Sequence, residues 1–221
     1  MPCGTGSSRL GSVVSPEGVG RDNANVKSAK RDVLLAGVGG QGIVSIAAAL
    51  ATAALAEGWY LKQAEVHGMS QRGGAVQSHL RISGDVIYSD LISLGSADLL
   101  LSVEPLEALR YLPYLSEGGM LVTAREPYRN IAAYPETAAL ERALSDIPGR
   151  IVVDAESLAR EAGHPRTANM AVLGAAALFT GIAAESLAAA ISTLFGAKGP
   201  KVIEANLRAF HLGREATEQL G

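Results

Sequence analysis

Four glycines within six residues form the segment of this sequence that is best suited to chemistry. Gly37, Gly39 and Gly42 match the pattern G-x-G-x-x-G, and Gly40 and Gln41 lie between them. Glycines permit a tight turn and let the backbone approach a pyrophosphate, while free N–H groups at a helix N-terminus favour an anion. We interpret the segment as a phosphate-binding loop, with close packing of a strand against a helix as the alternative.

A second glycine-containing segment, residues 67–74, is polar and follows a predicted strand. Arg72 can present its guanidinium fork to a phosphate or a carboxylate while nearby backbone N–H groups surround the anion. His67 is a candidate proton carrier, although a structural histidine is the favoured interpretation. The predicted ligand contacts of this segment are Ser70, Gln71, Arg72, Gly73 and Gly74.

Further polar residues suit either a ligand or a structural role. Asn169 and Thr167 precede a long apolar segment, so each is a candidate for ligand contact or for helix N-capping. Asn169 is kept as a predicted cofactor-binding residue. The other histidines are interpreted as structural or surface groups: His79 in a strand, His164 in a turn before a proline, and His211 at the surface.

The glycine loop alone leaves other functions open. Glu65 stands about 20 residues after it, where a dinucleotide-binding enzyme has the acid that binds a ribose. An NAD(P)- or FAD-binding Rossmann dehydrogenase is therefore an alternative, as is a binding module that senses a nucleotide without catalysis. Adenylating enzymes of the ubiquitin-activating type share the glycine pattern but usually bring cysteines, and the only cysteine here is Cys3.

Positioning these residues requires alternating strands and helices. The fold class is predicted as α/β: a Rossmann-like, mostly parallel sheet with helices on both faces and one hairpin at Gly84-Asp85. Apolar runs predict strands at residues 33–38, 60–66, 76–82, 86–88, 99–103, 120–123 and 151–153. Helices are predicted at residues 43–57, 105–112 and 137–144 and from 168 onward, with breaks near 181 and 196–200.

Composition limits the class of protein. Of 221 residues, 48% are hydrophobic, which suits a subunit that buries surface against a partner. The net charge of -3 does not favour a nucleic-acid partner. No apolar run approaches the length of a membrane span and no signal peptide is evident, so a cytoplasmic location is expected. A single cysteine cannot form a disulfide within the chain or hold a cluster, and no metal site is predicted.

The predicted domain organisation is simple. Residues 1–30 are rich in glycine, serine and polar groups without periodicity, so we expect a disordered N-terminal extension. Residues 31–221 are expected to form a single domain.

The two loops together carry a resemblance to a known family. The segment AGVGGQG, followed by EVHGMSQRGG, resembles the gamma-type domain of 2-oxoacid:ferredoxin oxidoreductases. Asn169 to Gly174 is similar to the N-x-x-x-L-G helix start of that family, and the resemblance covers residues 31 to about 215. Within the family, the similarity is greatest to the small, or beta, subunits of enzymes that oxidise aryl pyruvates such as indolepyruvate.

The resemblance implies a reaction and a division of labour. The reaction is the oxidative decarboxylation of an aryl pyruvate with coenzyme A, which gives an acyl-CoA, carbon dioxide and reduced ferredoxin. The family places thiamine diphosphate, Mg²⁺ and [4Fe-4S] clusters on a larger alpha subunit, so the implied partners are that subunit and ferredoxin, in an assembly such as α2β2. The chain is then inactive alone.

The sequence lacks a thiamine-binding motif, which agrees with the placement of thiamine diphosphate on the alpha subunit. Gly84-Asp85-Val86 is its nearest approach to a thiamine motif and lacks the second glycine, and no asparagine occurs between Asn25 and Asn130. From the resemblance we expect Arg72 and the backbone donors of residues 39–42 to help bind the phosphates of coenzyme A. The alternative is that both loops are interface elements that order the alpha subunit.

Overall fold

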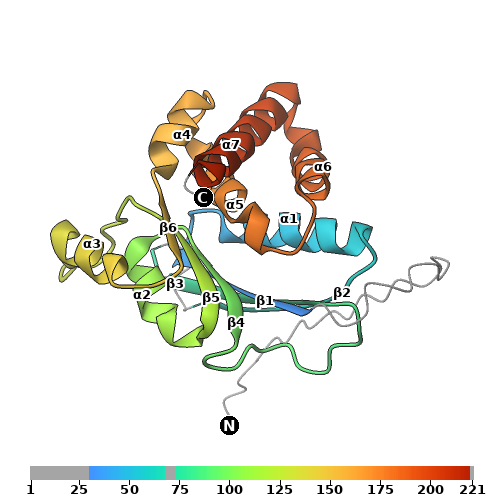
Figure 1. The fold of residues 1–221 in the computed structure, drawn as a ribbon. Coiled ribbons are helices and arrows are strands. Elements are labelled where there is room, and N and C mark those ends of the chain that lie inside the picture. Colours follow the sequence, from blue (N-terminus) through green and yellow to red (C-terminus); the bar gives the residue numbers. More distant parts are fainter. Residues whose placement is uncertain (1–29, 68–72, 220–221) are drawn as a thin grey trace, which may run out of the picture.

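A six-stranded sheet lies at the centre of the structure, a computed structural model that describes residues 30–67 and 73–219 (Figure 1). The strand order is β2-β3-β1-β4-β5-β6. The expected extension, residues 1–29, lies outside the described residues, and the first strand begins at Lys30, one residue before the predicted domain start. The strands are β1 (Lys30–Val38), β2 (Tyr60–His67), β3 (Ala75–Ser83), β4 (Ala97–Ser102), β5 (Leu115–Ala124) and β6 (Arg150–Val153).

The sheet is parallel on one side of β1 and antiparallel on the other. Strands β1, β4, β5 and β6 pair in parallel, as apolar runs buried on both faces predict. Strand β3 pairs antiparallel with β1, with Lys30 opposite Ser83, and β2 pairs antiparallel with β3. The predicted α/β fold is confirmed, and its sheet is mixed.

The predicted hairpin at Gly84-Asp85 is wrong. Residues 86–88 form no strand, because both edges of β3 are already paired, one with β1 and one with β2. The segment instead runs outside the sheet, where the Lys62 Nζ donates to the carbonyl oxygen of Tyr88 at 3.4 Å. The antiparallel hairpin of this fold is the one between β2 and β3.

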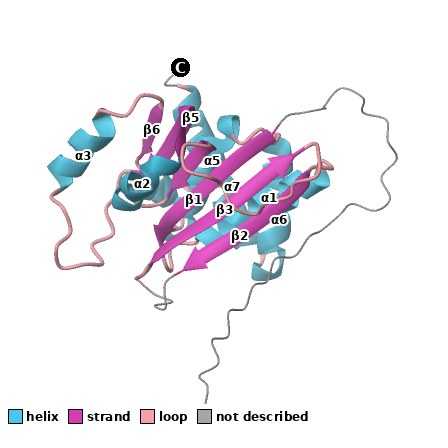
Figure 2. Cartoon of the chain, turned by 90° about the horizontal axis from the view of Figure 1, so that it is seen from below, coloured by secondary structure: helices cyan, strands magenta, loops and turns pink. Residues whose placement is uncertain are grey.

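Helices cover both faces of the sheet, as predicted (Figures 1 and 2). Five helices lie on one face and two, α2 and α3, on the other. The predicted break near residue 181 separates α5 from α6, and that near 196–200 separates α6 from α7. The helices are α1 (Ile43–Ala56), α2 (Pro105–Tyr111), α3 (Thr137–Ser145), α4 (Ala155–Glu161), α5 (Ala168–Ala176), α6 (Ala184–Phe195) and α7 (Pro200–Glu218).

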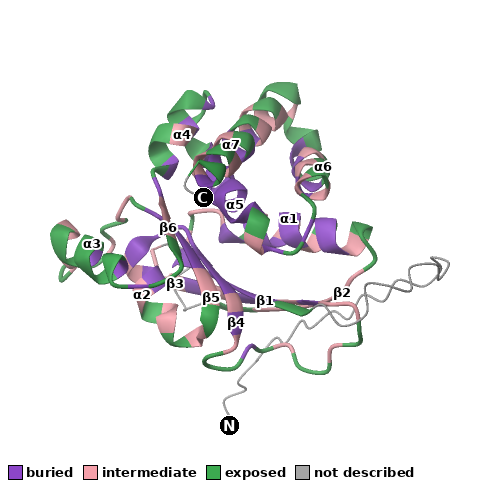
Figure 3. Ribbon diagram, viewed as in Figure 1, coloured by how far each residue is buried: buried purple, intermediate pink, exposed green. Residues whose placement is uncertain are grey.

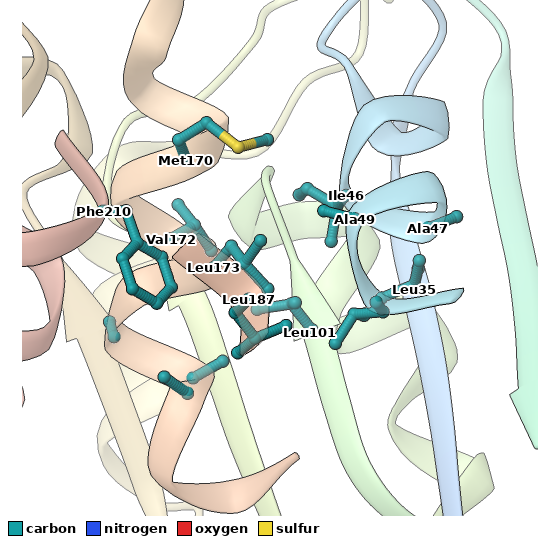
Figure 4. Close-up of a cluster of buried hydrophobic side chains, with 14 of the residues drawn as sticks. Leu35, Ile46, Ala47, Ala49, Leu101, Met170, Val172, Leu173, Leu187 and Phe210 are labelled. Atoms are coloured by element: carbon teal, nitrogen blue, oxygen red, sulfur yellow. The ribbon is translucent and has the colours of Figure 1, made fainter. Parts of the chain in front are cut away.

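The main core lies between the sheet and the helices on the five-helix face (Figure 3). Leu35 of β1 and Leu101 of β4 point from the sheet toward Ile46 of α1 and Leu173 of α5 (Figure 4). Burial of each such side chain contributes about 1.5–3 kcal/mol. Within the described residues, no helix combines the length and apolar character needed to cross a bilayer.

Two glycines bring α5 and α7 into backbone contact. A methyl group at Gly174 would fall on the carbonyl oxygen of Phe210, and one at Gly213 would fall on that of Ala171. The two contacts are reciprocal, since each helix supplies one glycine and one carbonyl. Helices α5 and α7 therefore pack closer than any larger residue at these positions would allow.

A buried polar network fastens β3 to its neighbours. Asp32 is fully buried and receives two hydrogen bonds from the Arg81 guanidinium, at 2.9 and 3.2 Å. The Nδ1 of His79 accepts a hydrogen bond from the Ile92 N–H at 3.1 Å, and His79 is only 2% exposed. Burial, and then the Arg81 charge, lower the pKa of His79. These contacts confirm the interpretation of His79 as a structural histidine.

We expect acid to destabilise the domain through His79. Because its pKa in the folded state lies below the value of about 6.5 for an unfolded chain, the unfolded state takes up a proton first as the pH falls. The free energy of unfolding should therefore decrease below pH 6.5, by at most about 1.4 kcal/mol per pH unit from this group, until the lower folded-state pKa is passed.

Urea unfolding at a series of pH values from about 5 to 7.5 measures this slope. The variant His79→Asn keeps an acceptor near the position of Nδ1 but cannot titrate, so its slope should be smaller. Equal slopes for the variant and the wild type would contradict the assignment to His79.

Candidate functional site

The glycine loop joins β1 to α1 and uses its glycines in two different ways. A Cβ at Gly37 would come within 2.5 Å of the Val103 side chain and 2.7 Å of that of Ile43. Gly40 and Gly42 have positive φ angles, of 101° and 87°. Close packing, the alternative interpretation of this loop, therefore explains Gly37, and the path of the backbone explains Gly40. Both apply to Gly42, where a Cβ would also collide with the Asn169 Nδ2.

The Gln41 side chain bridges the ends of two parallel strands. Its Oε1 accepts a hydrogen bond from the Val38 N–H at 2.8 Å, and its Nε2 donates to the Val103 carbonyl at 3.4 Å. From these ends the chain enters α1 on one face of the sheet and α2 on the other. Such a point, where neighbouring parallel strands send the chain to opposite faces, is where open α/β sheets bind ligands.

The structure brings the two predicted loops together. The Gly39 N–H donates to the Gly74 carbonyl at 2.9 Å, and the Gly73 N–H donates to the Gly39 carbonyl at 3.4 Å. The predicted ligand donor at Gly39 is thus already used within the protein. Among the described residues, none accepts a hydrogen bond from the N–H group of Gly40 or Gly42.

Asn169 contacts the glycine loop directly. Its Nδ2 donates to the Gly42 carbonyl at 3.2 Å from the first turn of α5. Thr167, not Asn169, occupies the N-cap position, and its hydroxyl donates to the His164 carbonyl at 2.7 Å. Two sequence-predicted site residues that are far apart in the chain, Asn169 and Gly42, are therefore neighbours.

Other predicted residues lie elsewhere or outside the described part of the chain. Ser70, Gln71 and Arg72 are not among the described residues, and for His67 only the backbone is described, at the end of β2. Glu65 is exposed on β2, and β3 separates that strand from β1. Because a dinucleotide-binding fold needs its second strand beside the first, Glu65 is not placed to bind a ribose beside the glycine loop.

A pocket of about 780 Å³ opens beside the glycine loop. It lies at the carboxyl ends of β1, β4, β5 and β6, and its volume is that of a small-molecule site. The first turns of three longer helices, α1, α5 and α7, and of the short helix α4 line it, so positive helix ends meet there. Its basic side chains are those of Arg166, Lys198 and Lys201, and its polar lining further includes Ser45, Glu126, Glu156, His164, Asn169 and Asn206.

Two carboxyl groups modify the charge of this pocket. Burial, followed by a hydrogen bond with Asp154, raises the pKa of Glu126 to about 7. The Ser157 N–H holds the pKa of Asp154 below its usual value, so the proton shared by this pair resides on Glu126. The raised pKa of Glu126 reduces its negative charge near neutral pH, which leaves the basic side chains and helix ends of the pocket less neutralised.

Sequence reasoning missed most of the pocket's basic residues. Lys198 and Lys201 flank the break before α7, which the sequence marked only as Gly-Ala-Lys-Gly-Pro. His164, predicted as part of a turn, does form one, and its Nδ1 accepts from the Arg166 N–H at 3.1 Å. Two lysines near the start of a long helix could have suggested an anion site. That these lysines lie near the glycine loop, however, depends on how α7 packs against α5, which the sequence does not reveal.

The chain does not suit an iron–sulfur cluster. Such a cluster takes four cysteine ligands, and the sequence contains one cysteine. Within residues 30–67 and 73–219, no group of three or more His, Cys, Asp or Glu side chains could hold a metal ion. The donor set of the pocket, backbone amides and cationic side chains, suits an anionic organic ligand.

Fold and site together define an α/β domain of the open-sheet type, with a pocket at its switch point. Residues 32–216 match the family described as pyruvate ferredoxin/flavodoxin oxidoreductase. Because this match spans most of the chain, the protein belongs to that family.

Individual relatives agree with this assignment. The indolepyruvate oxidoreductase subunit IorB of Pyrococcus horikoshii is 37% identical over 199 residues, which cover 86% of this chain and 96% of that protein. The gamma subunit of a keto/oxoacid ferredoxin oxidoreductase from Geobacter sulfurreducens superposes with a TM-score of 0.61 at 25% identity, over 86% of this chain and 99% of that one. A 2-oxoglutarate:ferredoxin oxidoreductase from Magnetococcus marinus shares the fold, with a TM-score of 0.69 at 22% identity, over 87% of this chain and 32% of that one.

The contact between Gly42 and Asn169 yields a stability prediction. Gly42→Ala should destabilise the domain by about 1–3 kcal/mol, because alanine strains the positive φ and its methyl group would collide with the Asn169 amide. Gly40→Ala is the matched control, since Gly40 also has a positive φ but a methyl group there would meet nothing within 4 Å. Gly40→Ala should lower the free energy of unfolding only through the strain of alanine at a positive φ, by about 1 kcal/mol.

Urea unfolding of the single variants and of Gly42→Ala combined with Asn169→Ala measures both terms. Removing the Asn169 amide should bring the cost of Gly42→Ala down to that of Gly40→Ala. If Gly42→Ala and Gly40→Ala cost the same with Asn169 present, the loop and α5 are not in contact as described.

Proposed function

We propose that this chain is the small subunit of a heteromeric, ferredoxin-dependent 2-oxoacid oxidoreductase whose substrate is an aryl pyruvate such as indolepyruvate. Family membership supports the reaction class, and the similarity to an indolepyruvate oxidoreductase subunit over nearly its full length supports the aryl substrate. The reaction is the oxidative decarboxylation of the oxoacid with coenzyme A, and ferredoxin accepts the electrons. We expect the enzyme to work in the cytoplasm.

Within this assembly, we propose that the chain helps to bind coenzyme A by its phosphates. The observation that carries the proposal is the convergence of the glycine loop, three helix N-termini and Lys198 and Lys201 on one pocket. Coenzyme A carries a pyrophosphate and a further phosphate, so a pocket of backbone donors and cations matches its charge. The N–H groups of Gly40 and Gly42 and the two lysines would contact the phosphates.

Arg72 remains a proposed contact from the second loop. In the sequence, Arg72 directly precedes Gly73 and Gly74, whose main-chain groups bond to Gly39. Charge reversal of Arg72 in the assembled enzyme should raise the KM for coenzyme A or weaken association with the larger subunit. If both stay unchanged, neither the ligand role nor the interface role of Arg72 survives.

The electron-transfer groups are proposed to lie on the partner. A larger alpha subunit would carry thiamine diphosphate, Mg²⁺ and the [4Fe-4S] clusters, because the one cysteine of this chain cannot supply cluster ligands. The thiamine cofactor would perform the decarboxylation there. This chain would contribute binding and orientation of the co-substrate.

The charge of Lys201 gives a direct test of the pocket. Lys201→Glu should raise the KM for coenzyme A about tenfold or more in the assembled enzyme, because it replaces attraction of a phosphate by repulsion. The KM for the oxoacid should not change. Arg208→Glu is the matched control, since Arg208 is an exposed cation on the same helix that does not line the pocket.

Steady-state kinetics at two ionic strengths separate the outcomes. The effect of Lys201→Glu should shrink at high salt, as expected for a screened charge. An equal change for Lys201→Glu and Arg208→Glu, or a change in the oxoacid KM alone, would contradict a coenzyme A site in this pocket.

Expression with and without the larger subunit tests the division of labour. The chain purified alone should be colourless, contain no iron and reduce no dye from an oxoacid. Co-expressed with its partner, it should be isolated in a brown complex with iron–sulfur absorption. Bound iron in the single chain, or tight NAD binding by it in calorimetry, would instead favour a self-sufficient redox enzyme, and nucleotide binding without any stable partner would favour a sensing module.

A further inference from the structure

A buried glutamate lies directly behind the pocket without lining it. Glu104 follows β4, is 1% exposed and is absent from the pocket's lining residues. One carboxylate oxygen, Oε2, accepts a hydrogen bond from the Glu107 N–H at 2.8 Å and so caps α2. The other, Oε1, accepts from the Tyr128 N–H at 3.2 Å and from the Tyr134 hydroxyl.

Capping alone does not account for a glutamate at this position. Serine, threonine, aspartate and asparagine are the preferred N-cap residues, and their shorter side chains do the same work. Taking a carboxylate out of water is also unfavourable unless hydrogen bonds replace its hydration. What the longer side chain of Glu104 adds is its second oxygen, which extends to Tyr128 and Tyr134 while the first one caps the helix.

The segment that Glu104 holds is a wall of the pocket. Residues 125–136 connect β5 to α3 without helix or strand, and three of them, Glu126, Pro127 and Tyr128, line the pocket. Few main-chain bonds fix such a segment, so the side-chain bonds to a buried carboxylate carry much of its order. We call it the wall segment.

The wall segment is also joined to the glycine loop. The Asn130 Nδ2 donates to the Gly73 carbonyl at 2.7 Å, and the Gly73 N–H donates to the Gly39 carbonyl at 3.4 Å. Hydrogen bonds, together with the main chain between Tyr128 and Asn130, therefore connect Glu104 through the wall segment and Gly73 to the glycine loop. The wall segment and the glycine loop both line the pocket.

We propose that Glu104 is a positioning residue, which sets the spacing between the wall segment and the glycine loop and thereby the affinity of the pocket for its phosphate-bearing ligand. The inference rests on the proposed function of the pocket, and it assigns to Glu104 no contact with the ligand. The bonds of Glu104 to Tyr128 and Tyr134 hold the wall segment to the end of β4, and the bond from Asn130 to Gly73 holds it to the residue that bonds to the glycine loop.

The surroundings of Tyr134 keep its hydrogen bond to Glu104 in place at neutral pH. Burial, together with the hydrogen bond to Glu104, raises the pKa of Tyr134, so its hydroxyl keeps its proton and remains a donor at neutral pH. The Arg129 guanidinium lies 5.7 Å from the centre of the Tyr134 ring and further restrains that side chain.

Two variants separate positioning from helix capping. Glu104→Asp keeps a preferred cap residue for α2 but is too short to hold Tyr128 and Tyr134 at the same time. Tyr134→Phe leaves Glu104 and its cap intact and removes only the hydroxyl. The control is Tyr111→Phe, which removes a partly buried tyrosine hydroxyl of α2 that bonds to none of the described residues.

The assembled enzyme gives two readouts. Glu104→Asp and Tyr134→Phe should each raise the KM for coenzyme A about tenfold, with the oxoacid KM and the kcat at saturating coenzyme A unchanged. Hydrogen exchange measured by mass spectrometry should become faster in residues 126–134 of both variants and stay at the wild-type rate in Tyr111→Phe.

Hydrogen exchange and the coenzyme A KM test different steps of this proposal. Wild-type exchange in residues 126–134 of Tyr134→Phe would overturn the positioning role, even if Glu104→Asp did not fold. Faster exchange without any change in the coenzyme A KM would overturn the link between spacing and affinity. Failure of the proposed pocket itself would show separately, as a coenzyme A KM that does not respond to Lys201→Glu.

Discussion

Strand β1 pairs in parallel with β4, and the Gln41 side chain ties the carboxyl ends of these two strands together. The chain leaves the two ends toward opposite faces of the sheet, and the pocket opens at this point. Gln41 is itself part of the glycine loop, which lines the pocket together with the first turns of α5 and α7. The pocket therefore depends on this one parallel pair being held at its end.

The antiparallel insertion of β3 changes what the pocket can bind. In a dinucleotide-binding fold, the strand after the first helix returns beside β1 and presents an acid to a ribose. Here β3 takes that place, and it brings Gly73 and Gly74 to the glycine loop instead. The neighbourhood of the loop is thus made of backbone amides, an asparagine and lysines. This neighbourhood lacks the acid that binds a ribose in a dinucleotide-binding fold, and its amides and lysines suit phosphate charge.

Local sequence information was enough for much of the fold. Apolar runs predicted the parallel strands, since burial on both faces leaves few alternatives, and glycine with proline predicted the helix breaks. The prediction of a hairpin at residues 84–85 is wrong because a turn signal does not reveal whether the edge of the preceding strand is free to pair. Both edges of β3 are paired, which is a property of the whole sheet.

The site was predictable only in part, for a related reason. The glycine pattern identified Gly40 and Gly42, and Asn169 was predicted as a cofactor-binding residue, but its contact with Gly42 was not predicted. Lys201 and Glu126 reach the pocket from segments far away in sequence, and neither carries a local pattern that sets it apart from a surface charge. Glu104 resembles an ordinary helix cap until the position of Tyr134 is known.

The reciprocal glycine contacts between α5 and α7 have a mechanical consequence for the pocket. At Gly174 and Gly213 no side chain separates the two backbones, so we expect the two helices to move together as one rigid block. Asn169 of α5 and Lys201 of α7 both belong to that block, so the distance between their backbones stays constant. A bulky ligand can then gain room only by tilting the block as a whole over the sheet or by displacing the irregular segments at its rim.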